Sequence, residues 1–258
     1  MKNGGILLRK IRVALTPRNW FLKAKLPDGS VIFGQNRPGF GGRGIYIFRE
    51  LIEPEFRHLE RFLVRDGVFL DVGANTGIYT IKAARHVGGN GTVVAMEPFP
   101  EILAALYRSV NVNGLNNVRV RNVCAGANTR HGQLWMNGGK PNSFSLIDRG
   151  DAAGNLSTLV VALDDLMQWE QLNRLDYLKI DAEGSENDVL LGAKNSIEQH
   201  RPIIQAEINI SEIKFALREY SCFHAPGSPN NLYIPNEHPG TAAAQAIDWE
   251  KVTLPVVT

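Results

Sequence analysis

The chain of 258 residues is long enough for one α/β domain with attachments and a sizeable buried core. Hydrophobic residues make up 44% and charged residues 21%, close to a globular average, which excludes a disordered chain. The net charge is only +2, but the first 27 residues hold seven basic residues and no acidic one. We interpret this basic arm as a solvated amphipathic helix docked on the body; weak contact with an anionic membrane surface is the alternative.

The number of cysteines and the hydropathy of the chain indicate in which cellular compartment the protein is expected. The two cysteines, Cys124 and Cys222, cannot form a disulfide framework or a cysteine zinc site. The apolar run Ile6–Leu8 is cut short by two basic residues, so it does not resemble a signal peptide, and no stretch is long enough to span a bilayer. We therefore expect a cytoplasmic protein; the sequence does not indicate its oligomeric state.

Residues 1–66 are predicted to form an attachment that packs on the core. After the basic arm, Phe21–Leu26 and Val31–Phe33 read as the strands of a hairpin around a Pro-Asp-Gly turn. The glycine-rich segment Gly39–Gly44 follows as a loop. Apolar residues at helical spacing then predict a helix over Glu50–Val64.

From residue 67 strands and helices alternate, which is typical of a parallel sheet. Strands are predicted over Val68–Val72, Thr92–Met96, Val118–Ala125, Leu175–Ile180 and Ile203–Ile208, with short strands at Cys222–His224 and Asn231–Ile234. Helices are predicted over Gly77–His86, Glu101–Asn113, Asp164–Gln171, Glu186–His200 and Ser211–Glu219. We predict one doubly wound α/β domain over residues 67–240 and a C-terminal tail over 241–258.

Residues 126–163 interrupt this alternation. Short strands are predicted at Gln133–Met136, Phe144–Ile147 and Leu159–Leu163, between turns rich in Gly, Asn and Pro. We interpret the segment as a β-rich insertion. Loops at the edge of such a sheet usually determine which ligand binds. We therefore expect the insertion, together with Gly39–Gly44, to form the side of a ligand cleft that holds the acceptor substrate.

A nucleotide-binding turn follows the first strand of the domain. The strand runs into Asp71-Val72-Gly73-Ala74-Asn75-Thr76-Gly77 and then into a helix. Asn75 stands where the dinucleotide fold has a glycine that lets a pyrophosphate approach the backbone. A side chain there disfavours NAD and suits S-adenosylmethionine, which has no phosphate. We expect Asp71 to accept from an ammonium group or from loop amides.

The next strand ends supply the rest of the expected cofactor site. Glu97 closes the second strand, where a carboxylate can accept from both ribose hydroxyls. Pro98 and Phe99 suit an apolar wall for adenine, and Asn122, Cys124 and Ala125 are expected near the adenine edge. Ligands of such sheets bind beyond the carboxyl ends of the strands, where all these residues lie.

The chain resembles the FkbM-type methyltransferase family. The resemblance rests on Phe69–Thr80, Glu97-Pro98, Leu178–Glu186, Leu190–Ala193 and Pro202–Glu207, and it is most specific in the Lys-Ile-Asp-x-Glu-Gly-x-Glu stretch that begins at residue 179. It implies a class I Rossmann-like fold, S-adenosylmethionine as cofactor, and usually O-methylation of a hydroxyl on a sugar, polyketide or related metabolite. Carried over by position, the cofactor contacts are Asp71, Gly73, Asn75, Gly77 and Glu97, and Asp181 borders the transferred methyl group.

A second acidic cluster is the candidate catalytic site. Asp181, Glu183 and Glu186 follow one strand, and Glu207 lies near the end of the next. Adjacent strands are ~4.7–4.9 Å apart, so Asp181 and Glu207 are expected to share one cleft. A metabolite hydroxyl is a very weak acid, so a carboxylate that accepts its proton is useful. We expect Asp181 to be this base, with Glu207 and Glu183 behind it; for Glu183 a role at the start of the next helix is equally consistent. No metal is required.

Three alternatives remain at this point. An NAD(P)-dependent oxidoreductase is disfavoured by Asn75 and by the absence of a hydride-transfer residue set. A nucleic-acid partner is disfavoured because no Asp- or Asn-Pro-Pro-Tyr run is present and Cys124 lacks a preceding proline. A non-catalytic nucleotide-binding module is disfavoured because the cofactor loop and the acidic cluster are both present. The expected partner is a small-molecule or glycan hydroxyl acceptor.

Overall fold

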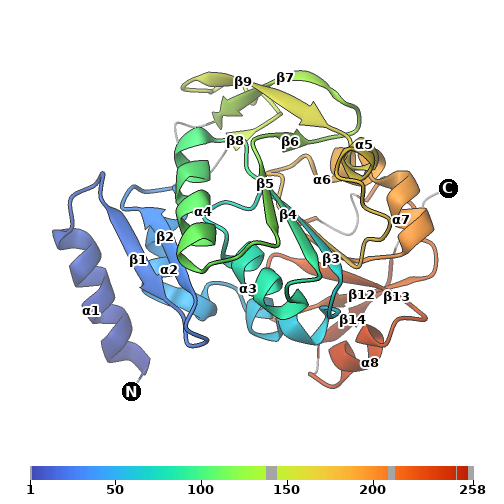
Figure 1. Ribbon diagram of the computed structural model, residues 1–258, viewed down its shortest axis with the longest axis horizontal. Coiled ribbons are helices and arrows are strands. Elements are labelled where there is room, and N and C mark those ends of the chain that lie inside the picture. The colour runs from blue at the N-terminus through green and yellow to red at the C-terminus, as the bar shows by residue number, and fades with distance from the viewer. Residues whose placement is uncertain (1, 138–143, 209–212, 248, 255–258) are drawn as a thin grey trace.

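The computed structural model describes residues 2–137, 144–208, 213–247 and 249–254. It contains a central mixed sheet with helices on both faces, an N-terminal attachment and a smaller sheet above one end of the central one (Figure 1). Among the helices within these ranges, none is long and apolar enough to cross a membrane. The predicted α/β fold with a mostly parallel sheet is confirmed.

The central sheet has eight strands in the order β14-β12-β13-β11-β10-β3-β4-β5. Its strands are β3 (Val68–Val72), β4 (Thr92–Met96), β5 (Val118–Arg121), β10 (Tyr177–Ile180), β11 (Ile203–Ala206), β12 (Tyr220–His224), β13 (Asn231–Pro235) and β14 (Glu250–Val252). Strands β11, β10, β3, β4 and β5 are parallel, and the other three pair antiparallel. Successive strands are added on one side of β3 (β4, β5) and on the opposite side of β10 (β11 and beyond). The strand order therefore reverses between β3 and β10, and sheets of this kind bind ligands at the carboxyl ends of the strands that flank such a reversal.

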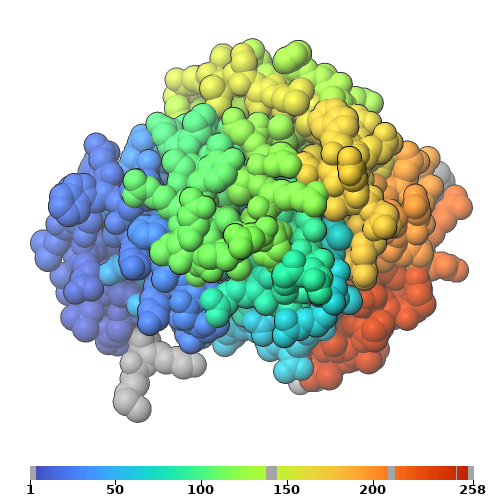
Figure 2. Space-filling view, viewed as in Figure 1, coloured from blue at the N-terminus to red at the C-terminus, as the bar shows by residue number. Residues whose placement is uncertain are grey.

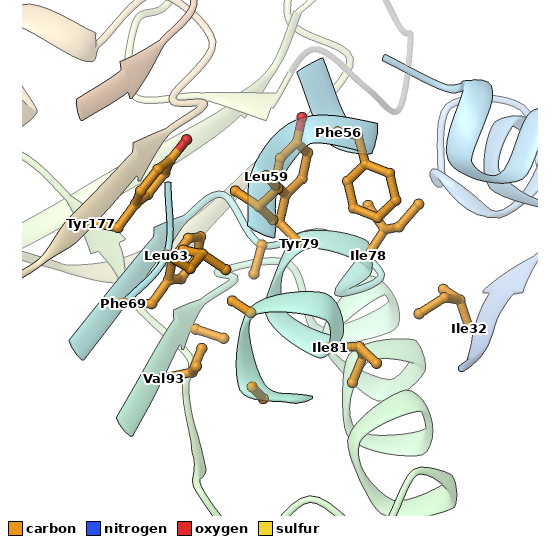
Figure 3. Close-up of a cluster of buried hydrophobic side chains, with 14 of the residues drawn as sticks. Ile32, Phe56, Leu59, Leu63, Phe69, Ile78, Tyr79, Ile81, Val93 and Tyr177 are labelled. Carbon is orange, nitrogen blue, oxygen red and sulfur yellow. The ribbon is translucent and has the colours of Figure 1, made fainter. Parts of the chain in front are cut away.

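Helices cover both faces of this sheet: α3 (Ile78–Val87), α4 (Pro100–Val112), α5 (Leu163–Trp169), α6 (Glu186–Gly192), α7 (Lys194–His200) and α8 (Gly240–Gln245). Along β3, Phe69 packs in the core on the α3 side, whereas Leu70 and Val72 pack in the core that contains α5, α6 and α7. Figure 3 shows the first core, in which the ring of Phe69 stacks on Tyr177 with centroids 5.0 Å apart. Burial on both faces explains the continuous apolar runs of these strands.

The N-terminal attachment is α1 (Lys2–Leu15), the hairpin β1 (Phe21–Lys25) and β2 (Val31–Gln35), α2 (Gly42–Phe48), and the 3-10 helices η1 (Arg49–Leu51) and η2 (Glu55–Arg61). The hairpin packs on α4, where Asn113 both donates to and accepts from the backbone of Val31. Two predictions are wrong here. Helix α2 begins inside the expected loop Gly39–Gly44, and the expected helix Glu50–Val64 is two 3-10 helices separated around Pro54, which has no amide hydrogen to donate.

The predicted insertion forms a sheet of its own in the order β6-β9-β7-β8 (Figure 1, top). Its strands are β6 (Cys124–Ala125), β7 (Arg130–Met136), β8 (Phe144–Ser145) and β9 (Asn155–Val161). The expected continuous strand Val118–Ala125 is divided, because β5 pairs with β4 in the central sheet whereas β6 pairs with β9. The chain passes from one sheet to the other between residues 121 and 124.

Three further predictions about the C-terminal half are corrected. The expected helix Glu186–His200 is two helices separated at Ala193. Of the expected helix Ser211–Glu219, residues 211 and 212 lie outside the described residues and 213–219 are not helical; Ile213 and Leu217 are buried by an irregular chain instead. The expected tail contains α8 and β14; β14 pairs with β12, and the buried ring of Trp249, just before β14, stacks on Phe62.

Candidate functional site

The turn between β3 and α3 takes left-handed backbone at three positions. Gly73, Asn75 and Gly77 have φ values of 71°, 50° and 90°. Asparagine tolerates this region better than most residues, which explains how it replaces a glycine here. At Gly73 a Cβ atom would lie 2.0 Å from the carbonyl oxygen of Asp181. The glycine therefore lets the end of β10 approach the turn directly.

Glu97, at the end of β4, ties this turn to the next loop. Its Oε2 accepts from the amide of Asn75 at 3.0 Å, and its Oε1 accepts from the amide of Phe99 at 2.8 Å. Burial raises the pKa of Glu97 to about 7, although both hydrogen bonds act in the opposite direction. Asn122 donates to the carbonyl oxygens of Glu97 and Pro98, so it holds the loop in place.

These elements enclose a cleft of about 690 Å³, counting the space open to solvent at its mouth. The lining residues that the sequence predicted are Gly73, Asn75, Glu97, Pro98, Cys124, Ala125, Asp181 and Glu183. Five other predicted residues lie outside this lining: Asp71, Gly77, Phe99, Asn122 and Glu207. The structure thus brings the end of β10 and the nucleotide turn into one cavity.

Asp71 lies behind the cleft wall. It is fully buried, and its Oδ2 accepts from the hydroxyl of Thr80 at 2.5 Å, whereas Oδ1 has no hydrogen-bond partner among the described residues. Burial raises its pKa, against the opposing charge of Lys179. Its predicted contact with an ammonium group stays a prediction.

Lys179 belongs to a stretch that the resemblance uses, but sequence analysis gave its side chain no role. Its ammonium lies 3.3 Å from Oδ2 of Asp181, and its side chain is 4% exposed against 38% for that of Asp181. Burial lowers the pKa of Lys179, but Asp181, Asp71 and Glu53 outweigh burial and raise it. A lysine inside a buried strand was the available signal, since such a charge needs partners. It fixes the Asp181 carboxylate at the cleft.

The remaining acids divide between the cleft and its surroundings. Glu183 lines the cleft, and burial of its carboxyl, with Asp181 and Glu207 nearby, raises its pKa to about 7. Glu186, not Glu183, closes the turn before α6, because its Oε1 accepts from the amides of Ala182 and Gly184. Glu207 lines a neighbouring groove with His224, and burial, followed by the charge of Asp181, raises its pKa.

The insertion closes the cleft with side chains that sequence analysis did not single out: Leu134, Phe144, Ser145 and Leu146. Phe144 stacks on Phe99 with ring centroids 3.9 Å apart. The hydroxyl of Ser145 donates to the carbonyl of Glu183 at 2.9 Å. The insertion therefore contacts both the adenine-side loop and the acidic turn.

These residues fit S-adenosylmethionine. Glu97, whose carboxyl lines the cleft, would face a ribose diol, and Pro98, Phe144 and Leu134 would supply apolar surface for a base. The polar groups of Asn75 and Asp181 line the other part of the cleft, where an amino-acid portion would lie. Within the described ranges, no group of three His, Cys, Asp or Glu side chains is arranged to hold a metal ion.

The chain is similar in sequence to known methyltransferases. The family model described as "Methyltransferase FkbM domain" matches residues 71–224. A curated relative, "Methyltransferase 1" of Beauveria bassiana, is 26% identical over 169 residues, which are 55% of this chain and 68% of that protein.

Solved structures are more distant. The FkbM methyltransferase of Methylobacillus flagellatus has 20% identity and a TM-score of 0.46; the match covers 74% of this chain and 52% of that one, so this chain spans about half its length. A SAM-dependent methyltransferase from Streptococcus mutans has 12% identity and a TM-score of 0.48, covering 84% of this chain and 55% of that one. The family match extends over more than half of the chain, from the nucleotide turn through β10 to β12. The chain therefore belongs to the FkbM family of S-adenosylmethionine-dependent methyltransferases.

Proposed function

We propose that this protein transfers a methyl group to a hydroxyl of a small metabolite or glycan, and that Asp181 accepts the hydroxyl proton. The observation that carries the proposal is the position of the Asp181 carboxylate. It lines the cleft beside the nucleotide turn, is partly exposed, and is held by the buried ammonium of Lys179. A carboxylate fixed in this way is suited to accept a proton from a weakly acidic group that is brought to it.

S-adenosylmethionine supplies an electrophilic methyl group when it is bound. The chain's own residues bind, orient and accept a proton. Glu97 accepts from ribose hydroxyls, Asn75 and Gly73 shape the turn, and Phe144 covers the apolar part of the cleft. Asp181 would take the proton of the acceptor hydroxyl as that oxygen forms its bond to the methyl carbon and the bond between this carbon and the sulfonium sulfur breaks, leaving the neutral thioether S-adenosylhomocysteine. Glu183 lines the same cleft and supports acceptor binding there, whereas Glu207 lines the neighbouring groove and acts on Asp181 and Glu183 only through its charge.

The test compares Asp181→Asn with Asp188→Asn, a control on the exposed surface of α6. Labelled S-adenosylmethionine is offered with a panel of sugars, polyols and phenols and with their amine-bearing analogues. Asp181→Asn keeps the side-chain shape but removes the proton acceptor, so turnover should fall ~10²–10⁴-fold. Affinity for S-adenosylhomocysteine, measured by calorimetry, should change much less, and Asp188→Asn should behave as wild type.

Three results would contradict the proposal in different ways. Near-normal turnover of Asp181→Asn would remove the proton-acceptor role. Label on the amines but on none of the hydroxyls would indicate N-methylation. Tight binding of S-adenosylhomocysteine with no transfer to any acceptor would support a binding module.

A further inference from the structure

Helix α1 carries an apolar stripe that faces away from the protein. Leu7, Ile11 and Leu15 are spaced four residues apart and are 60%, 48% and 80% exposed, and Leu8 beside them is 69% exposed. The opposite side of the helix packs inward through Val13, which is buried. Figures 1 and 2 show α1 at the outer flank of the molecule, on the far side of the hairpin from the central sheet. The helix thus presents its apolar stripe outward.

The stripe is bordered by positive charge. At 100° per residue, Lys10 and Arg12 flank it on either side. Arg18 and Trp20, which is 65% exposed, follow directly after the helix. No acidic residue occurs before Asp28. An exposed apolar stripe between basic side chains, with a tryptophan at its end, is the composition of helices that lie in a membrane interface.

Two arginines, one on α1 and one after α2, lie close together and form no ion pair with an acid among the described residues. The Nε atoms of Arg9, on α1, and Arg49, after α2, are buried and have no hydrogen-bond partner among the described residues. The two guanidinium groups are close enough that Arg49, after burial, is the main cause lowering the pKa of Arg9. Neighbouring guanidinium groups without an acid suit an oxyanion such as a lipid phosphate.

We propose that α1 binds an anionic lipid bilayer: Leu7, Leu8, Ile11 and Leu15 enter the interface, while Lys10, Arg12 and Arg18 contact anionic headgroups. The basic charge selects this occupant over a second copy of the chain. A symmetric contact would place the same stripe, with the same bordering cations, against itself, and like charges at such a contact are unfavourable. A bilayer with anionic headgroups complements both the stripe and its border.

The test uses the full-length protein and flotation with two kinds of vesicle, phosphatidylcholine alone and phosphatidylcholine mixed with the anionic lipid phosphatidylglycerol, which attracts basic segments. Wild type should float with the anionic vesicles only and should be released by high salt. L7Q/I11Q should bind at least ~100-fold more weakly, because two apolar side chains no longer enter the interface. K10Q/R12Q should bind ~20-fold more weakly, about fivefold for each charge.

Leu191→Gln is the matched control, because Leu191 lies on α6 and is 54% exposed. It should float as wild type does.

Trp20 reports how close the end of α1 lies to the bilayer: brominated lipids should quench the protein's fluorescence less in Trp20→Phe than in wild type. The proposal is overturned if wild type does not bind anionic vesicles or if L7Q/I11Q binds unchanged. It is also overturned if sedimentation shows a dimer that L7Q/I11Q dissociates, since a second copy would then cover the stripe.

Discussion

Glu97 links the backbone of two loops to the expected cofactor. Both of its oxygens accept from amides, one in the nucleotide turn and one at the start of α4, so the carboxylate sets the spacing of the cleft wall. Burial raises its pKa to about 7. Ribose hydroxyls that donated to this carboxylate would favour its charged form, so we expect cofactor binding to be coupled to the deprotonation of Glu97.

Cofactor affinity should therefore depend on pH. Below pH 7 Glu97 holds a proton that must leave when the diol binds, so affinity for S-adenosylhomocysteine should fall up to ~10-fold for each pH unit below that point and level off above it. Calorimetry at pH 6.5 in two buffers of different ionisation enthalpy should detect proton release. Glu97→Gln serves as the comparison: it should bind at least ~10-fold more weakly and release no proton from this site. An identical release from Glu97→Gln would assign the proton to another group.

At the scale of elements, sequence and structure agree where a local pattern decides the outcome. Strands β3, β4 and β10 are predicted because both faces are buried, and Glu97 and Asp181 are predicted because each directly follows such a strand. The prediction of one helix over Glu50–Val64 is wrong, because the spacing of its apolar residues also fits two 3-10 helices with a proline between them. Phe144, which lines the cleft, and Lys179, which lies buried behind Asp181, were missed for another reason.

Both missed residues depend on contacts between distant parts of the chain. Phe144 reaches the cleft because the insertion folds back on the loop after β4, 45 residues earlier. Lys179 has three carboxylates around it only because β3, β10 and the segment before η2 converge. Local periodicity carries no information about such packing. Likewise, the C-terminal residues read as a tail by composition, although Trp249 anchors them to the core.

The glycine segment before α2 supports the cofactor turn without lining the cleft. At Gly41, φ is +69° and a Cβ atom would lie 2.0 Å from Oδ1 of Asn75. Gly41→Ala should push Asn75 away and loosen its amide contact with Glu97, so the Kd for S-adenosylhomocysteine should rise ~10–100-fold. Gly29→Ala is the matched control, because φ is +86° but nothing lies within 4 Å of its Cβ position.

Each glycine substitution should cost ~1–2 kcal/mol of stability, since each places a side chain at a positive φ, and Gly41→Ala should cost more because its Cβ also displaces Asn75. Only Gly41→Ala should also lose cofactor affinity. The Kd for S-adenosylhomocysteine is measured by calorimetry at one temperature below both melting points. Equal Kd values for the two variants would show that the glycine segment does not influence the cofactor site.

At the scale of the whole molecule, the two cores enclose several carboxyl groups rather than apolar side chains alone. Burial raises the pKa of Glu53 to about 7, and it also raises the pKa of Asp71. Glu53 accepts from the hydroxyl of Tyr79, which lies between η2 and the sheet (Figure 3). The central sheet thus carries acids that are easier to protonate when the chain is folded than when it is unfolded. Such groups make the stability of the whole fold depend on pH.

The contribution of Glu97 to the free energy of unfolding should fall as pH rises from about 5 to 8, and it can be measured for this one group. Its pKa is about 7 in the folded protein against 4.5 ordinarily, so between these values the folded state holds a proton that the unfolded state has lost. Stability attributable to this group is complete below pH 4.5 and is lost as pH rises through 7, a difference of about 3 kcal/mol. Urea denaturation of wild type and Glu97→Gln at pH 5 and pH 8 should show that the variant loses about 3 kcal/mol less over this interval. The comparison holds even if the variant is less stable at both pH values, because lost hydrogen bonds from Asn75 and Phe99 affect both measurements.

Glu101→Gln, on the exposed first turn of α4, should follow wild type. If Glu97→Gln loses as much stability as wild type does, the Glu97 carboxyl titrates at its ordinary pKa and cannot couple proton release to cofactor binding.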